Sequence, residues 1–254
     1  APSIAPTGCS VGTKQGFSIV KYSITGSGSF DSISHGLSRA PEFGIFKSTD
    51  TSSTWGVYYT VNGNNTNWMQ LNATDIQGSN NASGGIAGNA FVRYTDSIVE
   101  IDHSAFAAEG NAGIGYMWHS VPGLQKFGKW TNNNSNDGTF IELGFRPALI
   151  LLKNTDNVEK WYWIDSSRHT YNEAAPSNNA AGAVNTLQPN TSNTEATSRG
   201  AHTNTTVDIL STGFKIRTTN PASGEISFGT RNYIYAAWAE APNINLYGAQ
   251  SNAR

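Results

Sequence analysis

The chain has few charged residues, a single cysteine and no long apolar run, and each shortage narrows what it can be. Asp, Glu, Lys and Arg make up 13% of the 254 residues, and the formal net charge is −2. This net charge argues against nucleic acid as a partner, because a nucleic-acid-binding protein needs a basic face. Cys9 alone cannot form an intramolecular disulfide, so the chain is not a disulfide-stapled scaffold. No apolar stretch reaches the roughly 20 residues of a membrane-spanning helix.

Catalytic and metal-binding patterns are also scarce. The five histidines show neither i, i+4 nor His-x-His spacing, so no metal site is predicted. Glu100-Ile101-Asp102 matches the start of a Glu-x-Asp-x-x-Glu hydrolase signature, but Ala105 replaces the acid that would donate the proton. Residues 133–138 match the start of a calcium loop, yet Gly144 stands where a bidentate acid is required. We predict a protein that is not an enzyme and needs no cofactor or metal.

Turn-forming and aromatic residues dominate what is present. Asn, Gly, Ser and Thr are abundant, and the chain contains 7 Trp, 10 Tyr and 11 Phe. The former favour turns and the latter favour β-sheets. Short runs rich in strand-forming residues are predicted to be strands at 17–22, 43–47, 148–153, 161–165 and 232–239. Residues 174–206 are poor in apolar side chains and are predicted to form a long surface loop.

Two stretches of the chain are copies of each other. Their anchors match in order: Lys21 with Lys129, Lys47 with Lys153, Trp55 with Trp161, and Trp118 with Trp238. The offset between the copies is 106 to 108 residues for the first three pairs and 120 for the last, so the second copy contains a longer internal loop. A repeated unit of this size predicts a scaffold that is built twice.

The predicted fold is therefore all-β, with duplicated, jelly-roll-like β-sandwich units, long polar loops and little helix. Residues 1–15 are predicted to be a linker, 16–123 the first repeat, 124–242 the second repeat, and 243–254 a C-terminal tail. One arrangement consistent with the duplication has the two repeats tightly joined and sharing one sheet.

Three residues are predicted to bind a ligand. Trp68 follows a polar run, and Tyr171 follows another that contains Arg168. Aromatic rings at polar loops can stack on sugar faces while Asn, Asp and Arg bond to hydroxyls. The alternative for each ring is packing, half-buried, under its loop. Lys47 and Lys153 end apolar strands and are predicted to extend their charges to solvent past a buried stem.

Ordered motifs along most of the chain resemble a known domain. They occupy residues 16–22, 35–43, 126–130, 138–148, 161–172, 210–219 and 233–240. Together these motifs resemble a domain recurrent in tail-fibre-like and other structural proteins of marine tailed phages, cyanophages among them. The resemblance covers roughly residues 16–242, implies a virion surface or extracellular location, and offers no catalytic residues to carry over.

The expected function is that of a tail-fibre or spike-like domain that attaches to a host-surface glycan. We expect a homo-oligomer, a trimer before any other, in contact with other virion proteins and without nucleic-acid binding or membrane insertion. Three alternatives remain open: an architectural virion component such as a capsid decoration or adaptor, a secreted carbohydrate-binding or fibril subunit, and a depolymerising enzyme.

Overall fold

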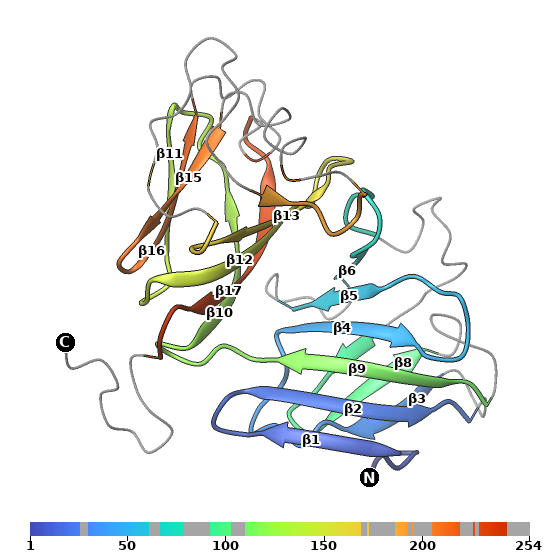
Figure 1. The fold of residues 1–254 in the computed structure, drawn as a ribbon. Helices are drawn as coiled ribbons and strands as arrows, with labels where there is room; N and C mark the ends of the chain where they lie inside the picture. Colours follow the sequence, from blue (N-terminus) through green and yellow to red (C-terminus); the bar gives the residue numbers. More distant parts are fainter. Residues whose placement is uncertain are drawn as a thin grey trace. The chain divides into compact units, whose positions relative to one another are not determined.

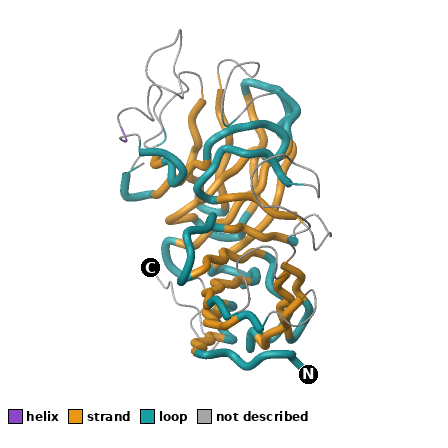
Figure 2. The backbone as a smooth tube through the Cα atoms, turned by 90° about the vertical axis from the view of Figure 1, so that its right-hand side faces the viewer, coloured by secondary structure: helices purple, strands orange, loops and turns teal. Residues whose placement is uncertain are grey.

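The computed structural model describes residues 1–25, 30–60, 67–78, 92–102, 110–168, 172, 186–192, 195, 205–218, 226 and 229–242. Strands and the loops between them account for nearly all of this described chain (Figure 2). The chain divides into two compact units, Ala1–Ser120 and Val121–Arg254. No helix among the described residues has the length and apolar character required to cross a membrane.

The described residues of the first unit form nine strands in two sheets (Figure 1). The strands are β1 (Gly8–Gly12), β2 (Phe17–Ser23), β3 (Phe30–Ser34), β4 (Phe43–Ser48), β5 (Gly56–Tyr59), β6 (Asn67–Gln70), β7 (Val92–Tyr94), β8 (Ile98–Asp102) and β9 (Ala112–Trp118). The main sheet has the order β1-β2-β9-β4-β5-β6, and the small sheet has the order β3-β8-β7.

In the part of the second unit that the structure describes, eight strands form two sheets. They are β10 (Gln125–Thr131), β11 (Asp137–Glu142), β12 (Pro147–Asn154), β13 (Trp161–Asp165), β14 (Thr186–Leu187), β15 (Thr205–Leu210), β16 (Gly213–Thr218) and β17 (Asn232–Ala239). The main sheet has the order β10-β17-β12-β13-β14, and the small sheet has the order β11-β16-β15.

The two units have the same strand order once β1 is set aside. The order β2-β9-β4-β5-β6 corresponds to β10-β17-β12-β13-β14, and β3-β8-β7 corresponds to β11-β16-β15. The registers also correspond, since Lys47 lies opposite Ile114 and Lys153 lies opposite Ile234. These positions differ by 106 and 120 residues, the offsets found between the copies in the sequence. The prediction of a duplicated all-β sandwich is confirmed.

Each unit has its own core between its main and small sheets. Side chains alternate across a strand, so one face of every strand is available for the core. In β9, for example, Gly113, Gly115 and Met117 are buried while their neighbours are half-exposed. The first core combines buried residues of β2, β4, β5 and β9 with those of β3, β7 and β8. The second combines the equivalent strands of the second unit.

Three expectations are corrected. Residues 1–15 are not merely a linker, because Gly8–Gly12 forms strand β1 along β2. No sheet among the described residues contains strands of both units. Lys153 does not extend to solvent: it is completely buried, and its Nζ donates to the Asn154 carbonyl oxygen at 2.8 Å. Lys47, the equivalent residue of the first unit, is partly exposed, as the prediction of a solvent-facing charge requires.

Candidate functional site

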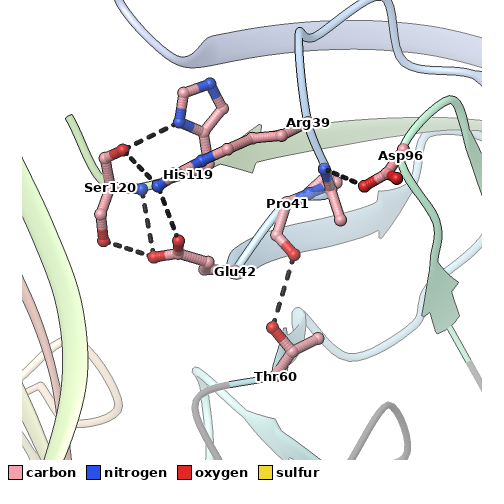
Figure 3. A network of polar contacts seen from close by, with 8 residues as sticks. Arg39, Pro41, Glu42, Thr60, Asp96, His119 and Ser120 are labelled. Carbon is pink, nitrogen blue, oxygen red and sulfur yellow. Dashed lines mark hydrogen bonds and ion pairs between the residues drawn. The ribbon is translucent and has the colours of Figure 1, made fainter. Parts of the chain in front are cut away.

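A polar network in the first unit contains the serine, histidine and carboxylate that a catalytic interpretation would require (Figure 3). Glu42 precedes β4, and Ser120 follows β9 by two residues. The Ser120 hydroxyl and backbone N–H both donate to Glu42 Oε2, the latter at 3.1 Å. Arg39 Nη2 donates to Glu42 Oε1 at 3.0 Å and to the Ser120 carbonyl oxygen at 2.7 Å.

The arrangement of this network suits a strand clamp better than a nucleophile. An activated serine needs a base on its hydroxyl that is in turn oriented by a third group. His119 instead makes its Nδ1 contact, 2.9 Å, with the Ser120 carbonyl oxygen (Figure 3). The Glu42 backbone N–H also donates to the Trp118 carbonyl oxygen at 2.7 Å. The network therefore ties the start of β4 to the end of β9.

The second unit also has an arginine–glutamate pair at the equivalent strand ends. Arg146 precedes β12, one position later than Arg39 when Lys47 is aligned with Lys153, and its Nε donates to Glu240 Oε2 at 2.8 Å. Glu240 is the counterpart of Ser120, and its backbone N–H donates to the Arg146 carbonyl oxygen at 2.9 Å. Both units therefore have an arginine–glutamate pair at this end of the main sheet, which favours a structural role for the network.

We call β9 and β17, the equivalent strands of the two units, the closing strands. A second repeated feature lies at the starts of these closing strands. Thr49-Asp50 follows β4 and Thr155-Asp156 follows β12. Asp50 Oδ2 accepts the Ala112 N–H at 2.7 Å, and Asp156 Oδ2 accepts the Asn232 N–H at 2.8 Å. The sequence contained the signal for this feature, because Thr-Asp follows both anchor lysines after one intervening residue.

One surface that differs between the units lies on β13 and β14. Trp163 is 36% exposed and Leu187, its cross-strand partner, is 42% exposed. Tyr162 and Ile164 point into the core. Because side chains alternate along a strand, Trp163 and Asp165 lie on the opposite face, about 7 Å apart along the strand. We call Trp163, Asp165, Arg168 and Leu187 the Trp163 surface.

An ion pair forms the polar end of the Trp163 surface. Asp165 Oδ1 accepts the Arg168 backbone N–H at 2.9 Å, and Oδ2 accepts the Arg168 Nε–H at 2.6 Å and a bond from Nη2. Burial alone would raise the pKa of Asp165, but the bonds from Arg168 outweigh it and lower that pKa. The carboxylate is therefore ionised at neutral pH and holds the guanidinium of Arg168 in a fixed orientation.

The three sequence-predicted ligand residues have different positions. Trp68 lies in the first unit, packs against its core and approaches Gly78 closely. This position agrees with the alternative that the ring packs, half-buried, under its loop. Arg168 lies in the second unit on the Trp163 surface. Tyr171 is outside the described residues. The run containing Trp163 was predicted to be a strand but not a binding site. Side chains alternate along a strand, and this alternation could have separated Trp163 and Asp165 from the core-facing residues.

Other candidate sites have structural partners. Glu100 pairs with Arg93 Nε at 2.8 Å, while the side chain of Asp102 is outside the described part of the chain. Asn133 Oδ1 accepts the Ser135 N–H at 3.1 Å, which makes the calcium-like run a capped turn. Among the residues that the structure describes, no group of three His, Cys, Asp or Glu side chains could hold a metal ion.

A comparison with known protein families matches both units of the chain to a single family. A family model described as a domain of unknown function, DUF7483, matches residues 3–242. The chain belongs to this family. The matched range contains the strands of both units, so the DUF7483 domain comprises the duplication and includes β1. Neither the curated proteins nor the solved structures contain a match.

Proposed function

We propose that this DUF7483 protein is a non-enzymatic carbohydrate-binding protein of a virion surface, and that the Trp163 surface contacts the glycan. The observation that carries the proposal is a half-exposed tryptophan beside a fixed Asp–Arg pair on a regular strand. A rigid ring supplies a stacking face, and the pair supplies hydrogen-bond donors and acceptors at a defined distance.

Charge favours a neutral glycan. The Asp165–Arg168 pair has no net charge, and the whole chain is weakly acidic at −2. An anionic polysaccharide would gain little long-range attraction from such a surface. One ring and two polar side chains give weak binding at a single site, so the proposal includes an oligomer, a trimer before any other, that binds through several sites at once.

The virion location rests on the motifs between residues 16 and 242 that resemble the marine-phage domain. The duplicated sandwich, with each closing strand clamped at both ends, suits a stable extracellular scaffold. An architectural virion component remains the second candidate, and it predicts that no exposed aromatic residue matters for attachment.

The test compares two tryptophans of similar exposure. Trp163→Ala removes the proposed stacking ring, while Trp55→Ala removes a ring that is 39% exposed in the first unit. The full chain and both variants are assayed for binding to immobilised neutral polysaccharide from the host envelope and to an acidic polysaccharide. We expect Trp163→Ala to weaken binding to the neutral polymer about 10-fold per site, equivalent to about 1.4 kcal/mol, and Trp55→Ala to bind like the parent.

Arg168→Ala, Trp68→Ala and Tyr171→Ala complete the panel. Arg168→Ala should also weaken binding, and circular dichroism confirms that each variant is folded. If all folded variants bind and adsorb to host cells like the parent, the proposed site is wrong and the architectural role gains support.

A further inference from the structure

Strand β1 is an exposed sheet edge without the usual protection. Natural edges are guarded by charges, prolines, bulges or covering segments. None of the five residues of Gly8–Gly12 is charged or proline, and the β1–β2 register has no shift from Gly8 to Gly12; the one irregular bond, from the Thr7 N–H to the Lys21 carbonyl oxygen at 2.8 Å, lies before the strand. Cys9, Ser10 and Val11 are all exposed. Such an edge is a template for pairing with another strand.

The hydrogen bonds of the neighbouring ladder show which backbone groups β1 offers. The His119 N–H donates to the Gly16 carbonyl oxygen at 3.0 Å, and the Ile24 N–H donates to the Asn111 carbonyl oxygen at 2.9 Å. Both bonds continue the β2–β9 register. Because bonded pairs alternate in an antiparallel ladder, even-numbered residues of β2 bond to β9 and odd-numbered residues face β1.

The β1 register then fixes the free edge. Gly8, Ser10 and Gly12 lie opposite odd-numbered residues of β2, so their backbone groups bond to β2. The N–H and C=O groups of Cys9 and Val11 consequently point away from the sheet. Two residues with outward backbone groups, separated by one residue, are enough for four new ladder bonds.

The sequence of β1 is self-complementary. Around Ser10, Gly8 matches Gly12 and Cys9 matches Val11 in position, so one face is small throughout and the other bears two compact apolar side chains. In an antiparallel pairing about Ser10, each outward-facing Cys9 would meet Val11 of the second copy. A twofold contact uses the same patch on both partners. The residues of β1 suit such a contact, because positions equidistant from Ser10 carry side chains of similar size.

We propose that β1 pairs antiparallel with β1 of a second copy of this chain, about a twofold axis at Ser10, joining two main sheets edge to edge. The contact is independent of glycan binding and of the Trp163 surface. If a trimer also forms through another surface, the β1 contact links two trimers.

Disulfide trapping tests the register. In the proposed pairing, Ser10 faces Ser10 of the second copy at a non-hydrogen-bonded position, where Cα atoms are about 4.5 Å apart, within the range for a disulfide. Ser10→Cys in a Cys9→Ser background should therefore form a cross-linked dimer on mild oxidation. The parent chain, with Cys9 only, should not, because Cys9 and Cys9 of the second copy lie on a diagonal.

Removing one outward N–H tests the contact itself. Val11→Pro deletes a donor that does not bond to β2, so it should halve the native mass measured by light scattering while the far-UV spectrum is unchanged. Val11→Thr keeps the N–H and should keep the parent mass. As a measurement without substitution, the amides of Cys9 and Val11 should be protected from hydrogen exchange at high protein concentration and exposed on dilution.

A parent mass in folded Val11→Pro overturns the proposal. So does the absence of cross-linking in the folded Ser10→Cys variant. If Val11→Pro does not fold, exchange of the Cys9 and Val11 amides that is independent of concentration overturns it instead.

Discussion

The two units fill equivalent positions of their main sheets with large and small side chains in opposite order. The row across β2, β9, β4 and β5 is Val20, Gly115, Phe46 and Gly56, and the row across β10, β17, β12 and β13 is Gly128, Tyr235, Leu152 and Tyr162. A Cβ at Gly115 would lie 2.5 Å from the Phe46 ring, and one at Gly128 would lie 2.6 Å from Tyr235 Cζ. The duplicated fold thus preserves strand register rather than the residue at each position, and large and small side chains still interlock within each row.

The exposed faces differ in another way. Trp55 is 39% exposed while Trp161, its counterpart, is 1% exposed. In turn, Trp163 is 36% exposed while its counterpart Val57 is completely buried. The half-exposed ring therefore lies two residues further along the second copy, beside an acidic residue that the first copy lacks. The two copies have the same strand order, so this difference in which tryptophan is exposed marks the candidate site.

The largest expected effect comes from a substitution in the row of side chains across the first main sheet. Gly115→Ala should destabilise the protein by about 2 kcal/mol because its methyl group meets the Phe46 ring. In a Phe46→Leu background, which copies the smaller residue of the second unit, the added cost should be lower by about 1 kcal/mol. Urea unfolding of the double-mutant cycle measures this coupling. Strict additivity of the substitutions at Gly115 and Phe46 would contradict the packing account.

The Thr-Asp clamps should be equivalent in the two units. Asp50→Ala and Asp156→Ala each remove a carboxylate that accepts a backbone N–H at the start of a closing strand. We expect each to cost about 1.5 kcal/mol, with Asp156→Ala the larger because Asp156 also accepts Asn232 Nδ2–H at 3.0 Å. Chemical denaturation measures both, with exposed Asp75→Ala as the control. If neither substitution lowers the free energy of unfolding, the repeated Thr-Asp pairs do not stabilise the two units.

The first unit should lose stability in mild acid through His35. His35 is completely buried; its Nδ1 accepts the Leu37 N–H at 3.1 Å, so its Nε2 carries the proton shared with the Thr95 carbonyl oxygen. Burial lowers the pKa of His35, an effect that His119 increases and that Thr95 and Asp96 oppose. The unfolded chain therefore binds a proton first as the pH falls below about 6.5.

Stability from His35 is thus complete above that pH and is lost between it and the lower folded pKa. The slope is at most about 1.4 kcal/mol per pH unit for one proton. Urea midpoints at pH 7.5 and 5.5 measure the difference for the parent and for His35→Asn, which keeps an acceptor for the Leu37 N–H. An unchanged pH dependence in the variant would rule out His35 as its source.

The smallest expected effect has the opposite sign. The Tyr22 hydroxyl is buried without a hydrogen-bond partner among the described residues, and burial raises its pKa. Tyr22→Phe should therefore stabilise the protein by about 1 kcal/mol. Tyr59→Phe is the matched control, because the Tyr59 hydroxyl donates to Gln77 Oε1 at 2.8 Å and its loss should destabilise. Thermal unfolding distinguishes the two signs.

Much of the fold could be predicted because the repeat constrains register. Once Lys47 matched Lys153 and Trp118 matched Trp238, the same strand pairs had to recur at the same offsets. Strand β1 was missed because Gly8–Gly12 has little strand propensity and no counterpart among the described strands of the second copy. Its place depends on pairing with β2, a tertiary contact.

The candidate site was predicted only in part. Arg168 was recognised from its polar run, whereas Trp163 was hidden in a strand where four of the five residues are hydrophobic. Exposure depends on which face the neighbouring strands cover, and composition does not contain that information. The burial of Lys153 was missed for the same reason, because a lysine at a strand end ordinarily reaches solvent.

The most direct test of the binding account is oxidative footprinting of the full chain with and without a saturating neutral polysaccharide. Trp163 and Trp55 begin with similar exposure, 36% and 39%, so they form an internal pair in one experiment. Mass spectrometry of peptides should show that bound glycan protects Trp163 from oxidation and leaves Trp55 unprotected. Equal oxidation of Trp163 in the bound and free protein would contradict the account.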